Sequence, residues 1–512
     1  MTSRRAGRCW LALLSGAPAL LVGQGAPPTP RQLSLPQALE LARKNSPTYR
    51  QTLNDADPAA AAVRSANWAR YPTLSAGSGV TYSGSGKSTF NATIFSQASP
   101  TVSSNYRLSA NWDLSARNFI GAAQSQALQR ATEENITGAG VSLTQTVTVQ
   151  YLTGLRAVAT VGVARQQVLR NQNFLDLARA RNQVGQATML DVRQAEVAKT
   201  RADVQLLRAR QNETDAKIEL FRLLGIATGE GLDSLTLSDA FPLVEATFDL
   251  AQLRTLAREH NPALRALDAQ ADAARLGVKS AKSEYLPSLS ISTGLSGFTQ
   301  QFTDANALLA NRLSGAQGSA ANCNFQNGIL QRLTSPHPAP NGGVIANCNA
   351  SAGLDATGAA LQPDVAQAIR SGNSVFPFSF TRQPISVSAS ISVPLWDGFS
   401  RATRVSQARA QEEDARESLR AQALAVDGQL QSRLLAVRTS WEASRLQDLN
   451  QVAAREQLRL AQEKYRIGNG SGLEVSDAQN AVTQAEADYV TAVYDYHLAV
   501  VGLEAVVGRP LR

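Results

Sequence analysis

Few residues of this 512-residue chain have the types and spacing that catalysis or metal binding requires. The three histidines, His260, His337 and His497, stand apart, and none has a second ligand at metal-binding spacing. The sequence shows no Ser/His/Asp set and no paired-carboxylate cleft. It therefore predicts a protein that is not an enzyme and that uses no cofactor or metal.

One glycine-rich segment resembles a phosphate-binding loop. Residues 84–89 read G-S-G-K-S-T and so carry the G-K-[ST] end of that motif. Position 81, however, is Thr where the motif needs its first Gly, and no helical pattern follows. We therefore expect no nucleotide site in this segment.

The net charge of +8 does not indicate nucleic-acid binding. Most of the basic residues are arginines, and these alternate with Glu, Asp and Gln along helical patterns instead of forming runs. Such spacing is typical of solvated helix faces. Only 6% of residues are aromatic, which suits long helices with narrow contact seams better than thick globular cores.

The first 26 residues resemble a cleaved secretion signal. Arg4, Arg5 and Arg8 precede the apolar stretch Leu11 to Val22, and Gly23-Gln24-Gly25 follows as a plausible cleavage site. The apolar stretch is shorter than the roughly 20 residues of a membrane-spanning helix. No later segment has 18 consecutive apolar residues, so we expect an exported protein that crosses a membrane only with strands.

Two cysteines, Cys323 and Cys348, remain once that signal is removed. An even number of cysteines in an oxidising compartment favours one disulfide. Two free thiols in a loop are the alternative.

Four segments alternate apolar with small polar residues, as strands with one face in lipid and one in water do. They are 74–82, 106–114, 288–295 and 385–393. The same pattern would fit a soluble sandwich, but four strands are too few to complete one. They are also too few to close a barrel, which needs about eight, and an open sheet edge cannot lie in lipid. We therefore expect several chains to share one barrel.

Very long helical patterns separate the strand pairs. The first runs over about 119–182, breaks near Gly185 and continues over 189–224. The second runs over about 400–466, breaks at 468–472 and continues to Val507. Apolar residues three and four apart line the last helix from Val475 to Val506, which predicts a helix-packing seam. Shorter helices are expected over 35–70 and 250–284.

The two halves of the chain repeat each other. One set of matching positions is separated by 215 residues. It pairs residues 41–43, Pro47 and 66–75 with 256–258, Pro262 and 281–290. Residues 224–225 return as 507–508. We therefore divide the chain into a signal (1–26), a first repeat (27–247) and a second repeat (248–512). The second repeat contains an insert at about 297–384, for which surface recognition, plugging of a pore and no role remain open.

This order of helix, strand, strand and long helical hairpin resembles the outer-membrane efflux proteins, the TolC-like channel-tunnels. The most specific match is Tyr465-Arg466-Ile467-Gly468 followed by Leu473 to Gln479, which is similar to the hairpin tip of that family. Its first-half copy is 183–192. The resemblance covers nearly all of 33–508 apart from the insert.

The resemblance implies a mainly α protein with a small transmembrane β part, located in the outer membrane with a periplasmic extension. It implies a homotrimer with a twelve-strand barrel in lipid and an α-helical tunnel. A periplasmic adaptor and an inner-membrane pump would dock at the hairpin tips near Gly185 and Gly468. The channel would serve a tripartite efflux or type I secretion system. Drugs, metals, other small molecules and polypeptides remain open as substrates.

The same resemblance assigns site residues. Glu474 and Asp477 match an acidic ring at the periplasmic gate, and residues three apart share a helix face. Tyr465 and Asp191 match the latch that ties neighbouring helices shut. The basic partner of that latch would fall at Gly470, and Arg466 is the candidate substitute. The alternative to a channel is an exported coiled-coil scaffold or periplasmic adaptor without a barrel.

Overall fold

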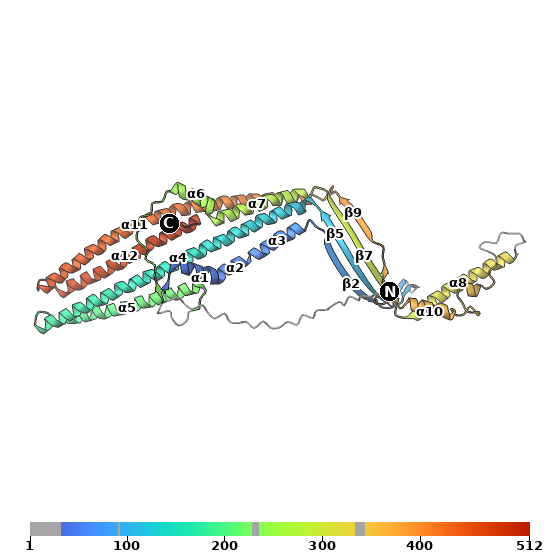
Figure 1. Ribbon diagram of the computed structural model, residues 1–512, viewed down its shortest axis with the longest axis horizontal. Coiled ribbons are helices and arrows are strands. Elements are labelled where there is room, and N and C mark those ends of the chain that lie inside the picture. Colours follow the sequence, from blue (N-terminus) through green and yellow to red (C-terminus); the bar gives the residue numbers. More distant parts are fainter. Residues whose placement is uncertain (1–31, 91–92, 228–234, 333–343, 512) are drawn as a thin grey trace, which may run out of the picture. The chain divides into compact units, whose positions relative to one another are not determined.

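A computed structural model of the chain describes residues 32–90, 93–227, 235–332 and 344–511. Side chains at 87–98 are not described, and the expected signal sequence lies outside the described residues. Long helices and one small sheet dominate the structure (Figure 1).

Helices and strands follow the same order twice. The first half contains α1 (Leu35–Asn45), α2 (Pro47–Asn54), α3 (Ala56–Trp68), β2 (Thr73–Ser83), β5 (Thr101–Leu114), α4 (Ala116–Gln183) and α5 (Met189–Leu224). The second half contains α6 (Leu250–His260), α7 (Pro262–Ser283), β7 (Ser288–Phe302), β9 (Ser386–Ser392), α11 (Ser400–Arg466) and α12 (Gly472–Val507). Short strands β1 (Gln32–Leu33) and β6 (Thr236–Leu237) pair in parallel. The expected duplication of helix, strand, strand and helical hairpin is confirmed.

The short helices before each strand pair are broken where the sequence pattern suggested one continuous helix. α2 begins at Pro47 and α7 begins at Pro262. A proline inside a helix removes a backbone hydrogen bond and clashes with the preceding turn, whereas the first helical position tolerates it. The prediction overlooked these two prolines, which begin new helices.

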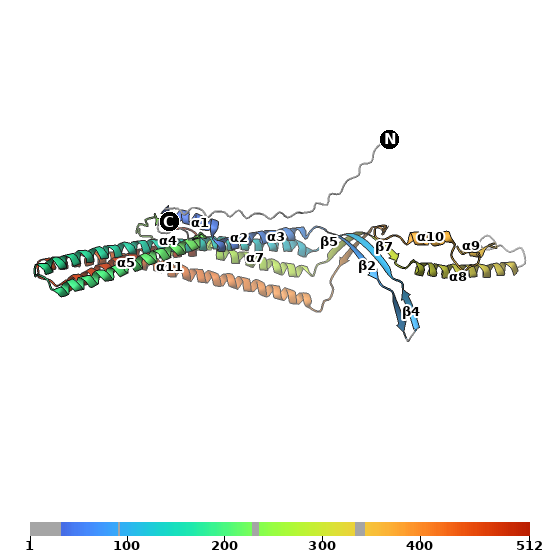
Figure 2. The same cartoon turned by 90° about the horizontal axis from the view of Figure 1, so that it is seen from below.

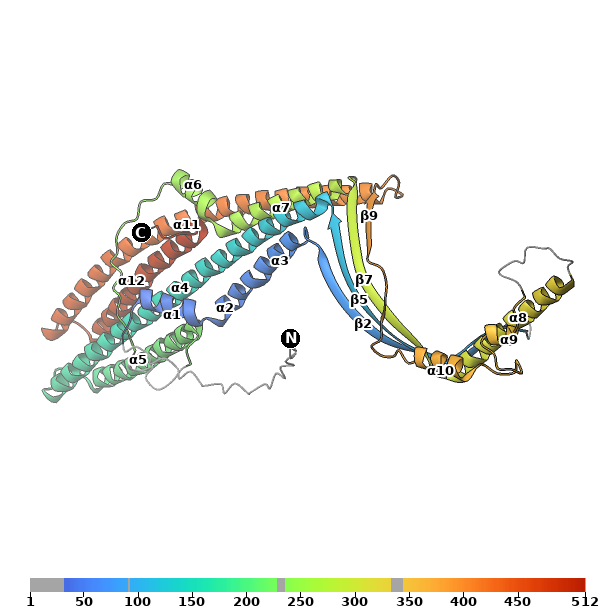
Figure 3. The same ribbon diagram turned by 45° about the vertical axis from the view of Figure 1, so that its right-hand side comes forward.

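The main sheet has the order β2-β5-β7-β9, and Figure 3 shows these strands side by side. Neighbouring strands are antiparallel. The two-residue strand β8 (Thr381–Arg382) also pairs with β7. β5 and β7 extend beyond the predicted strands, to Thr101 and Phe302.

The two faces of this sheet differ in chemistry. Small polar side chains bond across one face, where the Ser75 and Ser109 hydroxyls lie 2.7 Å apart. Large apolar side chains on the other face are open to solvent in the single chain, with Leu74 82% and Ile391 72% exposed. Exposed apolar area of this kind indicates that another apolar medium covers the face.

The long helices pack in pairs through the predicted seam. In α12, Val475, Ala478, Val482 and Ala485 of that seam are buried. They join a cluster with residues of α4, α5 and α11, among them Phe174, Ala195, Leu458 and Tyr465. The two hairpins therefore pack side by side through small side chains.

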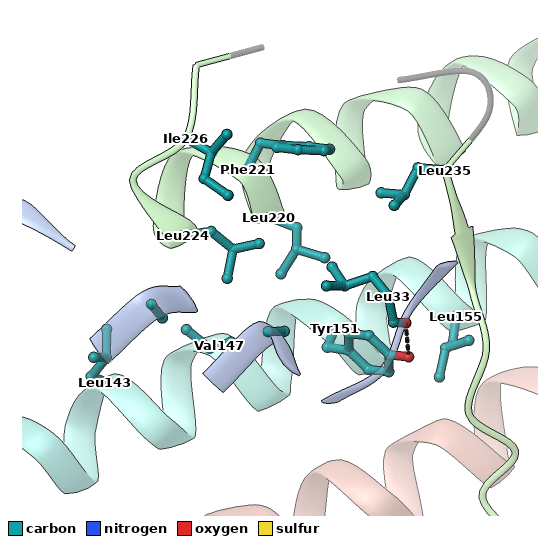
Figure 4. Packing of buried hydrophobic residues seen from close by; sticks show 12 residues of the cluster. Leu33, Leu143, Val147, Tyr151, Leu155, Leu220, Phe221, Leu224, Ile226 and Leu235 are labelled. Atoms are coloured by element: carbon teal, nitrogen blue, oxygen red, sulfur yellow. Dashed lines mark hydrogen bonds between the residues drawn. The ribbon is translucent and has the colours of Figure 1, made fainter. Parts of the chain in front are cut away.

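A second cluster packs the middle of α4 against the end of α5, α1 and β1 (Figure 4). Tyr151 of α4 is fully buried, and its hydroxyl donates a 2.8 Å hydrogen bond to the Leu33 carbonyl. In the second half, Tyr496 donates to the Val244 carbonyl over 2.6 Å. The repeated glycines Gly225 and Gly508 have positive φ values of 68° and 88°. A Cβ at either would lie within 2.5 Å of a backbone oxygen, so both positions require glycine.

The chain forms two compact units, and both take residues from each half. Among the described residues, the first unit contains those within 32–61, 126–227, 235–274 and 411–511. The second contains those within 62–90, 93–125, 275–332 and 344–410. Two helices, α4 and α12, contain stretches long and apolar enough to cross a membrane. Over a third of each stretch is buried inside the structure, and helices of a soluble core show the same composition.

The insert contains helices that the sequence analysis did not predict. They are α8 (Ala305–Arg332), α9 (Cys348–Ser351) and α10 (Pro363–Gly372), shown from another side in Figure 2. Cys323 and Cys348 form a disulfide with a Cα–Cα distance of 5.7 Å, which joins α8 to α9. The link between β2 and β5 contains a hairpin of β3 (Gly86–Phe90) and β4 (Thr93–Ala98). The segment at 84–89 that resembles a phosphate-binding loop therefore leads into strand β3.

Candidate functional site

Both long hairpins turn at a glycine in the left-handed region. Gly185 has φ 78° and Gly468 has φ 81°. The backbone N–H of Gln186 donates to the Arg181 carbonyl over 2.8 Å, and that of Asn469 donates to the Lys464 carbonyl over 2.9 Å. These bonds form the usual helix-ending turn in which a residue with positive φ follows the last helical turn. The two predicted tip glycines therefore have equivalent conformations.

Polar side chains cap the second helix of each hairpin. Thr188 and Asp191 cap α5 reciprocally, since the Asp191 backbone N–H donates to Thr188 Oγ1 and Asp191 Oδ2 accepts from the Thr188 N–H over 2.8 Å. Ser471 caps α12 by accepting from the Glu474 N–H over 3.2 Å. Asp191, which we expected in the latch, therefore also caps the start of α5.

The expected gate residues Glu474 and Asp477 lie in the first two turns of α12, and both are exposed. Within the part of the chain that the structure describes, no ion pair involves either carboxylate. Glu474 lies in the first turn of α12, where the helix dipole favours a negative side chain. Both carboxylates can therefore interact with ions or with charged groups of another chain.

Tyr465 lies inside the structure, only 4% exposed. Its ring packs 5.5 Å from the Phe174 ring, and the Arg181 guanidinium lies 4.6 Å from its centroid. The buried Tyr465 hydroxyl has no hydrogen-bond partner among the described residues. Burial raises the pKa of Tyr465, the charge of Asp191 raises it further, and Arg181 opposes the rise.

The basic residue at this tyrosine is Arg181 of the first hairpin. Its guanidinium donates a hydrogen bond to the Tyr465 carbonyl and so joins the end of α4 to the end of α11. Arg466, the substitute expected from the sequence, instead bonds Glu463 of its own helix over 3.1 Å. Arg181 was not predicted, because the family resemblance places the basic partner at Gly470 of the second hairpin, whereas Arg181 belongs to the first.

The starts of α5 and α12 also lie close together. A Cβ built on Gly472 would lie 3.1 Å from Asp191 Oδ1 and 3.7 Å from the Phe174 ring. Tyr465, Asp191, Arg181 and Gly472 therefore form one contact area between the hairpin ends, which we call the tip contact. The structure brings the two predicted latch residues together here, while Glu474 and Asp477 lie outside it.

An ion network around the buried carboxylate of Glu486 joins α4, α11 and α12. Glu486 of α12, only 8% exposed, accepts from Arg170 of α4 over 3.1 Å and from Arg455 of α11 over 3.0 Å. Two positive charges and one buried carboxylate thus link three helices. This network was not predicted from the sequence, although Glu486 directly follows Ala485, a residue of the apolar seam.

The tip contains charges and packing contacts, and nothing that suggests covalent chemistry. Among the described residues, no group of three or more His, Cys, Asp or Glu side chains could hold a metal ion. The tip contact consists of non-covalent contacts between helix ends, which can form and break.

The family profile of outer membrane efflux proteins matches residues 38–226 and 347–509. These two ranges cover more than half of the chain. The chain belongs to the outer membrane efflux protein family. Its members are outer-membrane channels, so this efflux protein is located in the outer membrane, and the scaffold alternative is rejected. The insert up to 346 lies outside the match.

Solved outer-membrane channels share the fold of this efflux protein. A membrane protein from Pseudomonas aeruginosa is 18% identical, with a TM-score of 0.65 and 93% of each chain covered. The outer membrane protein VceC of Vibrio cholerae is 16% identical, with a TM-score of 0.65, 93% of this chain and 97% of that chain. The CmeC outer membrane channel of Campylobacter jejuni is 14% identical, with a TM-score of 0.66, 93% of this chain and 85% of that chain. No curated protein matches the sequence.

Proposed function

We propose that three copies of this efflux protein form one gated duct through the outer membrane. Each copy would supply four strands to a twelve-strand barrel and two hairpins to a helical tunnel in the periplasm. Substrates would pass from an inner-membrane pump, through the tunnel, to the exterior.

The sheet carries this proposal. Among the strands that the structure describes, β2 and β9 each pair on one side only, which leaves two open edges. Unpaired backbone groups in lipid cost several kcal/mol each, so a sheet whose apolar face meets lipid must be closed by further strands. Neighbouring copies supply such strands when β9 of one copy pairs with β2 of the next.

The hairpin tips support a gate at the periplasmic end. Glu474 and Asp477 are exposed and unpaired with basic side chains in the described structure. Around a three-fold axis, three copies would bring six carboxylates together, which would repel one another and attract cations. The tip contact would act as the latch, with Arg181 as its basic member, because it joins the ends of the two hairpins.

A periplasmic adaptor and an inner-membrane pump would engage the turns at Gly185 and Gly468. These turns end the hairpins, and Val184 and Ile467 beside them are each 69% exposed. Two exposed apolar side chains at equivalent positions provide surface for a partner without loss of packing inside the chain. Docking there would separate the hairpins at the tip contact.

The gate is tested by Glu474→Ala combined with Asp477→Ala. In planar bilayers the double variant should show a higher single-channel conductance and weaker block by divalent cations, because the cation-attracting ring is gone. Glu417→Ala is the matched control, since Glu417 is an exposed carboxylate of α11 paired with Arg420. Conductance and block equal to those of the unmodified channel would remove the gate assignment.

A further inference from the structure

Arg107 of β5 stands among very small neighbours on the polar face of the sheet. Its cross-strand partners are Gly77 in β2 and Ser296 in β7. Cross-strand partners point to the same side of a sheet, and successive residues point to opposite sides. Arg107 therefore shares the face of Ser109, whose hydroxyl bonds Ser75, while Tyr106 and Leu108 belong to the apolar face.

The Arg107 side chain has no fixed partner. It is exposed, and within the described residues it takes part in no ion pair or hydrogen bond. A Cβ built on Gly77 would meet nothing within 4 Å, so Arg107 does not lie across its neighbour.

Among the described side chains of the sheet, no charged group lies close to Arg107 on this face. The described side chains of β2, β5, β7, β8 and β9 include two more charged groups, Asp113 and Arg382. Asp113 is six residues further along β5, about 20 Å at the usual strand rise, and accepts a 2.6 Å hydrogen bond from Ser290. Arg382 pairs with Gly297, the partner of Tyr106, and so lies on the apolar face.

We propose that the three Arg107 side chains of the trimer form a cationic ring in the barrel lumen that favours anionic solutes. This inference depends on the proposed trimeric duct, in which the polar face lines the lumen. The ring would attract solutes with a carboxylate or phosphate group and repel cations as they leave the cell.

The lumen charge can be measured with a thiol placed beside Arg107. Ser296→Cys places it on the directly paired residue, about 5 Å away between Cβ atoms. The reconstituted full-length channel is treated with two methanethiosulfonate reagents, one bearing a sulfonate and one a trimethylammonium group. The ratio of their reaction rates reports the local potential, and comparing ratios cancels differences in access.

Arg107→Gln in this background should lower the anion-to-cation rate ratio about threefold at ~0.1 M salt. The difference should nearly vanish at 1 M salt, where screening acts over about 3 Å. Arg382→Gln is the matched control, because it removes the same charge at nearly the same level from the other face. Its ratio should not change.

An unchanged ratio after Arg107→Gln would overturn the cationic ring, as would an equal fall after Arg382→Gln. Failure of the underlying duct gives a different result. If the polar face does not line an aqueous lumen, neither reagent modifies Ser296→Cys at an appreciable rate, with or without Arg107.

Discussion

At the scale of single residues, the tip contact depends on Arg181 more than on the tyrosine hydroxyl. Arg181 contacts the Tyr465 ring and donates to its carbonyl, whereas the buried hydroxyl has no partner among the described residues. A buried polar group without a partner costs free energy instead of contributing stability. The family resemblance identified Tyr465 and Asp191 from the sequence. It could not identify Arg181, because that contact depends on how two distant helix ends meet.

Arg181→Ala should therefore open the tip. Loss of the hydrogen bond from a charged donor and of the ring contact should cost about 1.5–3 kcal/mol locally. Faster hydrogen exchange of amides near residues 181–191 and 465–472, and a higher single-channel conductance, would show this. Arg466→Ala is the control, since Arg466 bonds only Glu463 of its own helix. Tyr465→Phe should leave exchange nearly unchanged; strong opening by Tyr465→Phe and none by Arg181→Ala would contradict this account.

At the scale of elements, the sequence predicted long helices well and short segments poorly. Regular spacing over many residues made α5, α11 and α12 recognisable to their ends, because each apolar position repeats the same signal. The insert helix α8 and the β3–β4 hairpin were missed. α8 is rich in Asn, Gly, Ala and Ser and has only two buried residues, Ala316 and Ala320, so it lacks a clear apolar stripe.

The ion network at Glu486 should contribute more to helix association than any surface ion pair. Glu486→Ala leaves Arg170, whose side chain is 20% exposed, and the more exposed Arg455 without their shared carboxylate. This should cost about 1.5–3 kcal/mol, as the loss of a hydrogen bond to a charged group does. Glu456→Ala removes an exposed pair with Arg459 and should change the stability little, because solvent screens exposed ion pairs. Chemical denaturation of the helical signal in detergent measures both. Equal losses of stability would show that the network does not hold the helices together.

At the scale of the whole molecule, both the sequence and the structure indicate an incomplete barrel. The alternating strands predicted an apolar face, and the structure adds the strand order with open edges at β2 and β9. The number of copies cannot be deduced from a single chain, because one four-stranded sheet does not determine how many such sheets close the barrel. The number three comes from the family resemblance.

The most direct test is the mass of the protein extracted in detergent, determined by native mass spectrometry. The account predicts a particle with three times the mass of the mature chain, because four strands from each copy close one twelve-strand barrel. A particle that remains a single folded chain at all protein concentrations would contradict it.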